Sequence, residues 1–156
     1  MIDDIDIQIL DILQSNGRIR RNDLAERVNL SIPSTSERLR KLEEAGYISG
    51  YSAIVDPKKL GKDITAFITV MIDSSKNYPK ILEHIQTMDE ILECHAITGE
   101  GSHLIKIRTD NTASLEKLLS RVQSWHGVVG TKTHLVLSTS KETMKINVNN
   151  LKLSRR

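Results

Sequence analysis

The sequence is poor in aromatic residues and contains one cysteine. Aromatic side chains make up 3% of its 156 residues, so its hydrophobic cores must be mainly aliphatic. Cys94 has no cysteine partner in the sequence, which excludes an internal disulfide and is typical of a reducing cytosol. We therefore expect a cytoplasmic protein whose stability depends on packing and not on covalent crosslinks.

Long apolar runs and a strong net charge are absent as well. No run approaches the roughly 20 apolar residues that a membrane span needs, and the acidic start MIDDID lacks the apolar centre of a secretory signal. The formal net charge of +2 is too small to indicate a nucleic-acid partner by itself. With 38% hydrophobic residues, the chain can build one or two small domains, and local patterns must indicate their function.

Two short helices joined by a tight turn are expected between residues 22 and 46. Asn22 is a candidate N-cap of the first helix, and Asn29 is a residue that tolerates the left-handed conformation of a helix end. Ser31 is a candidate N-cap of the second helix, and Gly46 follows the last turn of that helix. This layout is a helix-turn-helix, in which the second helix enters the DNA major groove.

The charges around this motif favour DNA. Between residues 18 and 41, seven basic residues face three acidic ones, a local net charge of +4. Serine hydroxyls and arginine guanidinium groups are suitable donors to phosphates and base edges. The alternative is that the basic side chains only solvate a helix and pair with its glutamates. The candidate DNA contacts are Arg18, Arg20, Arg21, Ser31, Ser34, Ser36, Arg38, Arg40 and Lys41.

The flanking sequence completes a DNA-binding domain over residues 1–50. A first helix is predicted over residues 3–15, with Asp3 as its N-cap. Residues 48–55 predict a short strand or hairpin wing, and DPKKLG predicts a turn at the domain boundary. We therefore assign residues 51–61 to a wing and linker.

The second half of the chain alternates strand and helix patterns. Strands are predicted over residues 64–72, 91–98, 103–109 and 128–137, and helices over 79–88 and 112–122. The order βαββαβ indicates a ferredoxin-like domain over residues 62–140, followed by a tail over 141–156. The whole is predicted to be an α+β protein, an N-terminal winged helix-turn-helix plus a C-terminal ferredoxin-like domain. The basic tail is interpreted as solvated, with a nucleic-acid-binding arm as the alternative.

Strand parity predicts which sheet face is buried. If strands 91–98 and 103–109 pair across their turn, one face carries Cys94, Ala96, Ile105 and Ile107, and suits the two helices. The opposite face mixes apolar and charged side chains. Because the first strand is apolar on both sides, we interpret this second face as a subunit interface. Its residues are Glu93, His95, Ile97, Leu104, Lys106 and Arg108.

In this order, these segments resemble the Lrp/AsnC family of leucine-responsive, or feast/famine, transcription regulators. The resemblance spans residues 2–146 and depends on the order and spacing of several stretches. They are IDIQIL and LQSNGR within 5–18, DLAERVNLS at 23–31, RLRKLEEAGYISGY at 38–51, VDPKKLG at 55–61, ECHAITGEGSHLIKIRT at 93–109 and HGVVGTKTHLVL at 126–137.

The resemblance implies a regulator that binds pseudo-palindromic operators as a dimer or a larger ring, such as an octamer. It also implies a small effector, commonly an amino acid, bound near the turn after the second strand. The implied effector residues are Gly99, Glu100, Gly101, Ser102 and His103. Where the family often has an acidic residue, this chain has Ser102, a weaker partner for an ammonium group. We therefore predict a weak response to simple amino acids, depending on Glu100 more than on Ser102.

Three other function classes compete with this interpretation. The five histidines show no metal-ligand spacing, so neither a metal site nor a cofactor is expected. Some proteins of this two-domain plan are tetrapyrrole decarboxylases, but the outward basic residues of the helix-turn-helix favour a regulator over an enzyme. An architectural protein that wraps DNA with little sequence preference is the remaining alternative. The expected partners are double-stranded DNA, further copies of the chain and a small effector, without a membrane.

Overall fold

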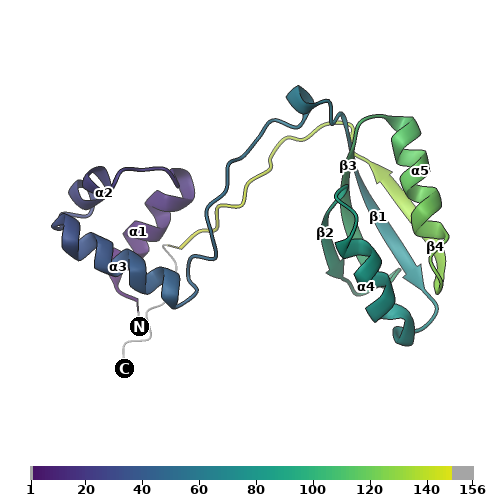
Figure 1. Cartoon of the computed structure of the whole chain (residues 1–156), viewed down its shortest axis with the longest axis horizontal. Helices are drawn as coiled ribbons and strands as arrows, with labels where there is room; N and C mark the ends of the chain where they lie inside the picture. The colour runs from purple at the N-terminus through teal and green to yellow at the C-terminus, as the bar shows by residue number, and fades with distance from the viewer. Residues whose placement is uncertain (1, 149–156) are drawn as a thin grey trace. The chain divides into compact units, whose positions relative to one another are not determined.

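The computed structural model describes residues 2–148 and divides them into two compact units (Figure 1). The first unit combines residues 2–54 with residues 141–148, and the second spans Val55–Ser140. Each unit has its own hydrophobic core, and the two cores share no residue. Within the described residues, no helix is both long and apolar enough to cross a membrane.

The first unit is built from three helices. These are α1 (Asp4–Ser15), α2 (Arg21–Arg27) and α3 (Ile32–Glu44). The Asp3 side chain caps α1, as predicted, in a reciprocal capping box with Asp6. The apolar faces of the three helices meet in one small cluster, whose buried members are Ile9, Leu10, Leu24, Val28, Leu39 and Leu42.

Two expectations for the first unit are wrong. The N-cap of α2 is Arg20, whose carbonyl accepts from the Leu24 N–H at 2.9 Å, so Asn22 lies inside the helix and does not cap it. Residues 48–55 form no strand. Within residues 2–148 no strand pairs with them, and a strand without a partner leaves its backbone groups unpaired. The Tyr51 hydroxyl instead donates to Glu43 of α3 at 2.9 Å.

Residues 141–148 return to the first unit. The Gln14 amide of α1 bonds both backbone groups of Ile146, donating to its carbonyl at 3.1 Å and accepting from its N–H at 2.8 Å. The Lys145 ammonium lies 2.9 Å from the Asp11 carboxylate, and Val148 is buried. The first part of the predicted tail is thus held against α1, while residues 149–156, with Lys152, Arg155 and Arg156, lie outside the described residues.

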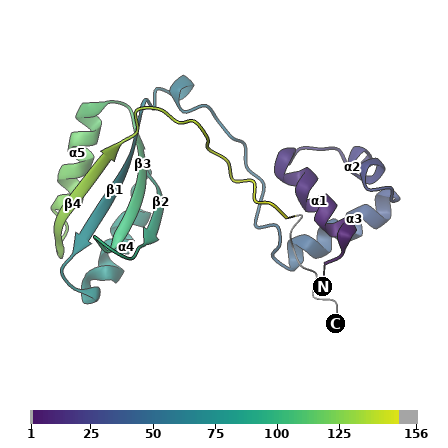
Figure 2. The same ribbon diagram turned by 180° about the vertical axis from the view of Figure 1, so that it is seen from behind.

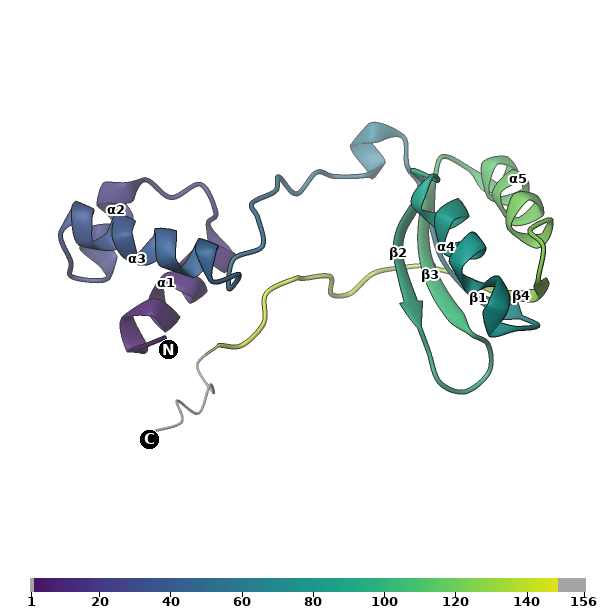
Figure 3. The ribbon, with the colours of Figure 1, turned by 60° about the horizontal axis from the view of Figure 1, so that its bottom comes forward.

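The second unit is an antiparallel sheet covered by two helices. Its strands are β1 (Ile64–Ile72), β2 (Ile91–Ala96), β3 (His103–Thr109) and β4 (Val128–Leu135), in the order β2-β3-β1-β4. The helices α4 (Tyr78–Gln86) and α5 (Thr112–Gln123) lie on one face of the sheet (Figure 3). Short 3-10 turns, η1 (Lys58–Leu60) and η2 (Ser75–Asn77), precede β1 and α4. The ferredoxin-like order of elements is confirmed.

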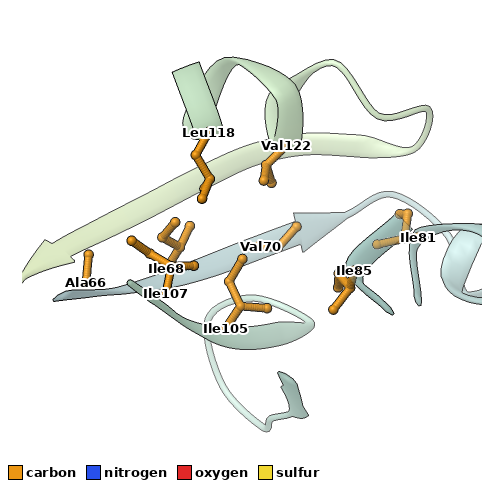
Figure 4. Packing of buried hydrophobic residues seen from close by; sticks show 9 residues of the cluster. All are labelled: Ala66, Ile68, Val70, Ile81, Ile85, Ile105, Ile107, Leu118 and Val122. Carbon is orange, nitrogen blue, oxygen red and sulfur yellow. The ribbon is translucent and has the colours of Figure 1, made fainter. Parts of the chain in front are cut away.

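The core of this unit lies between the sheet and the two helices (Figure 4). It is aliphatic, as the scarcity of aromatic residues predicts. Alternate residues of β1 and β3 point toward α4 and α5 because successive side chains of a strand point to opposite faces. The fully enclosed members are Ala66, Ile68, Val70, Ile81, Ile105, Ile107, Leu118 and Val122.

No helix of the second unit, Val55–Ser140, covers the opposite face of the sheet, and Figure 2 shows the sheet from that side. The predicted parity is confirmed, because Cys94 pairs with Ile105 while Glu93 pairs with Lys106. The half-buried Phe67 and Leu104 lie on the uncovered face. Apolar side chains in the middle of an uncovered sheet favour a protein partner over water.

Candidate nucleic-acid interface and effector turn

The turn between α2 and α3 has the geometry of a helix-turn-helix. Asn29 has φ +53°, the left-handed conformation expected for it. The Leu30 N–H donates to the Ala25 carbonyl at 3.0 Å, which closes the turn. Leu30 packs against the core of the first unit, so the turn is anchored as well as capped. The two helices are therefore held at a defined angle, as DNA reading by the second helix requires.

Serine and threonine side chains organise the start of α3. Ser31 caps the helix, as predicted, by accepting from the Ser34 N–H at 3.3 Å, and its hydroxyl donates to the Ser34 hydroxyl at 2.8 Å. The buried Thr35 hydroxyl donates to the Ser31 carbonyl at 3.0 Å. Ser31 and Ser34 are exposed and Ser36 is half-buried. Both exposed hydroxyls therefore stabilise the helix end while remaining accessible to a ligand.

The basic residues of α3 are compensated by acidic neighbours. The Arg40 guanidinium donates to Glu37 at 2.7 Å and lies 2.5 Å from Glu44, while the Lys41 ammonium lies 3.6 Å from Glu37. The Arg40 hydrogen bonds lower the pKa of the Glu37 carboxyl below its usual range. These pairs are exposed, so they contribute little stability and exchange readily for phosphate. Arg40 and Lys41 are thus available to DNA only by leaving an internal partner.

Arg38 points toward α1. Its guanidinium lies 2.8 Å from Asp3 and 2.8 Å from Asp6. The side chain is 30% exposed and that of Asp6 is 13% exposed, so the pair is partly withdrawn from water. The geometry favours a role between helices over the direct DNA contact expected for this residue.

Four arginines around α2 carry the uncompensated positive charge of the motif. Arg18, Arg20 and Arg21 precede or begin α2, and Arg27 ends it. All four are exposed, and none forms an ion pair with another residue of the 2–148 range. They are therefore the cations that a phosphate backbone can engage without breaking an internal pair.

Two exposed residues were not among the candidate contacts. Arg27 was counted in the local charge but not assigned to the interface, and its position in the last turn of α2 leaves its guanidinium in solvent. Ile32 is 48% exposed in the first turn of α3. An apolar side chain there can contact a thymine methyl group. The signal that could have identified Ile32 is an apolar residue directly after an N-cap, outside the buried stripe of Thr35, Leu39 and Leu42.

Replacing Arg20 with serine should change stability and DNA affinity in opposite directions. Arg20 has the extended N-cap backbone but makes no side-chain cap, so a serine hydroxyl should stabilise α2 by roughly 0.5–1 kcal/mol. The loss of one unpaired cation should weaken binding to a random-sequence duplex. Thermal unfolding followed by helical circular dichroism and titration by fluorescence anisotropy measure the two effects. Arg27→Ser is the control, because it removes the same charge without adding a cap; equal stability in both variants would contradict the capping argument.

The candidate effector turn between β2 and β3 is held by its two glycines. Gly99 has φ +94° and Gly101 has φ +103°, a region that side chains disfavour. A Cβ atom on Gly101 would lie 2.2 Å from Cγ2 of Thr69, whereas one on Gly99 would meet no atom within 4 Å. Gly101 is therefore required by close packing against β1, and Gly99 only by its backbone angle.

The polar residues of this turn have different environments. The Ser102 N–H donates to the Val70 carbonyl at 2.9 Å, and its hydroxyl accepts from the Ile72 N–H at 3.3 Å, so Ser102 is joined to β1. Glu100 is 82% exposed and forms an ion pair with Lys132 of β4. That ion pair lowers the pKa of the Glu100 carboxyl. Glu100 is therefore the accessible anionic group of this turn, and an ammonium ligand would compete with Lys132 for it.

His103 lies on the buried side of the turn. It is 4% exposed, pairs with Ala96 of β2, and its ring meets Tyr78 edge-on with centroids 4.9 Å apart. Its buried Nδ1 atom has no hydrogen-bond partner among residues 2–148. Burial lowers the pKa of this imidazole below its ordinary value. The structure thus places His103 against the helix side of the sheet, away from the exposed Glu100.

Acidification should destabilise the second unit through His103. The folded state disfavours the protonated ring. The stability that depends on a neutral ring is therefore fully present above the unfolded pKa of about 6.5 and is lost as pH falls through the folded pKa. His103→Phe should remove this component and stabilise the unit at neutral pH by about 1 kcal/mol, because no unpaired nitrogen is left buried. Urea midpoints from Trp125 fluorescence measure both effects. Midpoints are compared, not intensities, because His84 stacks on Trp125; a difference between wild type and variant that does not change with pH would contradict the assignment.

Comparison with known proteins identifies the family to which these two units belong. Residues 2–49 match a winged helix-turn-helix DNA-binding domain, and residues 65–146 match the Lrp/AsnC ligand binding domain. The chain belongs to the Lrp/AsnC family of transcriptional regulators. The fold class and the family expected from the sequence are thereby confirmed.

Three relatives illustrate how completely the chain matches. The HTH-type transcriptional regulator FL11 of Pyrococcus horikoshii is 36% identical over 147 residues, covering 94% of this chain and 97% of FL11. The leucine-responsive regulatory protein of Haemophilus influenzae is 37% identical, covering 91% of this chain and 87% of its own. A transcriptional regulator of Neisseria meningitidis, solved in complex with L-methionine, is 32% identical with a TM-score of 0.93, covering 97% of this chain and 99% of its own.

Proposed function

We propose that this regulator binds specific operator DNA in the cytoplasm through its first unit, with α3 in the major groove. The observation that carries the proposal is the anchored left-handed turn at Asn29, which joins α2 with its unpaired arginines to the capped start of α3. The arginines supply sequence-independent affinity, and the outward side chains of α3 supply base reading. No catalytic role is assigned.

The proposed contacts differ from the sequence-based set at three residues. Arg18, Arg20 and Arg21 are assigned to phosphates, because their charges are unpaired among the described residues. Arg40 and Lys41 are assigned to DNA at the cost of their exposed ion pairs. Ser31, Ser34 and Ser36 are assigned to the groove at the start of α3, where Arg27 and Ile32 are added. Arg38 is left out, since its guanidinium is already engaged by α1.

The uncovered face of the second sheet is proposed as the surface through which two chains associate. Phe67 and Leu104 supply apolar area on that face, and Lys106 and Glu93 pair beside them at 3.2 Å. A dimer presents two α3 helices, so its operator should be pseudo-palindromic with half-sites about one helical turn, ~34 Å, apart or a multiple of this. Sedimentation equilibrium at micromolar concentration tests the association, and a monomer would contradict it.

The turn Gly99–Ser102 is proposed as the effector site. Its glycines leave backbone N–H groups accessible to a carboxylate, and Glu100 offers an acceptor to an ammonium group. The Neisseria regulator solved with L-methionine supports an amino-acid ligand. Because Glu100 must exchange Lys132 for the ligand, we expect weak binding. Calorimetric titration with the twenty amino acids tests this, and a tight complex that survives Glu100→Gln would overturn the assignment.

Selection from a random-sequence duplex pool tests the proposed function as a whole. A specific regulator should enrich a pseudo-palindromic sequence and bind it ~10³-fold or more tightly than random duplex at physiological salt. Failure to enrich any sequence, with equal affinity for all duplexes, would favour an architectural protein. Protection of one DNA face in the major groove by the wild-type protein would place α3 as proposed.

A further inference from the structure

The guanidinium of Arg38 connects α3 to the beginning of α1. Its Nη1 atom donates to Oδ2 of Asp3 and to Oδ1 of Asp6, both at 2.8 Å. A terminal guanidinium nitrogen has two N–H groups, so both are used. The N–H groups of Nη2 and Nε remain, but the two Nη1 bonds direct the guanidinium toward α1, and the side chain is 30% exposed. A positively charged residue of α3 therefore binds acidic residues of the same unit.

The two aspartates that receive Arg38 already form the capping box of α1. Oδ1 of Asp3 accepts from the Asp6 N–H at 3.0 Å, and Oδ2 of Asp6 accepts from the Asp3 N–H at 3.0 Å. Each carboxylate thus gives one oxygen to the cap and the other oxygen to Arg38. The four bonds form a closed network, in which the orientation required by the cap also fixes the position of the guanidinium.

The opposite charges of Arg38 and Asp3 each favour the ionised form of the other. Hydrogen bonds from Asp6 and Asp3 raise the pKa of Arg38. Burial would by itself raise the pKa of the Asp3 carboxyl, but hydrogen bonds from the Asp6 N–H and Arg38 outweigh burial and lower it. Charge-assisted hydrogen bonds are shorter and stronger than neutral ones. Removing either partner leaves the other charge partly buried without compensation.

Arg38 is placed where such a link controls the direction of α3. It lies one helical turn from the buried Thr35 and Leu42, at the edge of the stripe that packs into the core. Aliphatic contacts are non-directional, so Leu39 and Leu42 permit small rotations of α3 about its axis. A two-point bond from Arg38 to α1 restricts that rotation, and a rotation would move every base-reading side chain of α3.

We propose that Arg38 is a positioning residue for base reading, which orients α3 through the Asp3–Asp6 capping box and does not itself contact DNA. This proposal rests on the proposed function of α3. It makes the acidic residue Asp6 a contributor to DNA recognition, although its charge repels phosphate. Direct contact by Arg38 makes the opposite prediction, since loss of the Asp6 charge would release the guanidinium to the DNA.

Asp6→Asn separates the two possibilities. Asparagine keeps the size of the side chain and one oxygen to accept from the Asp3 N–H, but it removes the charge that holds Arg38. We expect affinity for the duplex selected by the wild-type protein to fall about tenfold, roughly the discrimination of one base contact. Arg38→Ala should lose a similar factor, and the double variant should lose little more than either single one, because the residues act as a pair. Arg38→Lys, which restores one bond, should recover part of the loss.

Three readouts distinguish positioning from simple stability and from contact. Affinity for a random-sequence duplex and the salt slope should stay unchanged, whereas loss of a phosphate contact would reduce the slope by about one per protomer. Affinities are measured below the thermal midpoint of each variant, so a role in stability alone would leave selected-duplex affinity unaltered and overturn the proposal. Tighter or unchanged binding by Asp6→Asn would also overturn it. Failure of the wild-type protein to discriminate between duplexes would instead overturn the proposed function, a separate result.

Discussion

Replacing Gly101 with alanine should destabilise the second unit by about 3 kcal/mol or more. Two costs add at this position. The φ of +103° is strained for any residue with a Cβ atom, and that atom would lie 2.2 Å from Cγ2 of Thr69. Thr69 is 9% exposed in the central strand β1, so it has little room to move. Urea unfolding followed by the fluorescence of Trp125, the only tryptophan, should show the loss of stability, because Trp125 packs against the core of the second unit.

Gly99→Ala is the matched control for this prediction. It has a similar φ of +94° but no atom within 4 Å of the added methyl group, so it should cost only the backbone strain, about 1 kcal/mol. Thr69→Ser removes the clashing methyl group, and in the Gly101→Ala background it should return the cost to that of Gly99→Ala. Equal destabilisation by Gly99→Ala and Gly101→Ala would show that packing against Thr69 contributes nothing.

Replacing Leu39 with alanine should unfold the first unit and abolish DNA binding. Leu39 is 2% exposed in a small aliphatic core, and a leucine-to-alanine change in a core costs roughly 2–5 kcal/mol. A unit of this size has little stability to lose. The helical circular dichroism should fall while the Trp125 emission of the second unit stays native, since the two cores share no residue.

Ile32→Ala is the control for stability on the same helix. Its side chain is 48% exposed and lies outside the core, so the change should alter stability by no more than about 0.5 kcal/mol. Native-like helical signal and full DNA binding in Leu39→Ala would contradict the assignment of that core. A simultaneous loss of the Trp125 signal would contradict the independence of the two units.

Periodicity predicted most of the fold because the helices and most of the strands have one apolar face. The predicted bounds of β1, residues 64–72, and the start of β3 at His103 agree with the structure. What periodicity could not predict depends on contacts distant in sequence. Arg20 has no capping side chain, so the start of α2 is set by the packing of Leu24 and Ala25 and not by a local signal. Residues 141–148 carry no regular apolar period, and their place follows from bonds to Gln14 and Asp11 of α1.

The candidate site was predictable to the extent that charge and turn chemistry are local. The Asn29 turn, the Ser31 cap and the glycine turn at Gly99–Ser102 depend on residue type, and the structure has them where the sequence indicates. The environment of a charge is not local. Whether Arg38 faces solvent or Asp6 depends on the crossing of α1 and α3, and the burial of His103 depends on Tyr78 of α4.

The salt dependence of duplex affinity tests the central claim most directly, that unpaired arginines around α2 bring α3 onto DNA. Between about 50 and 200 mM salt, the wild-type protein should lose ~10³-fold or more in affinity if six or more phosphates are neutralised per dimer. Arg20→Ala with Arg21→Ala should reduce the slope by about two per protomer. Lys80→Ala with Lys117→Ala removes equal charge from exposed positions of the second unit and should leave the slope unchanged. A flat salt dependence for the wild-type protein, or equal slopes for the two double variants, would contradict the claim.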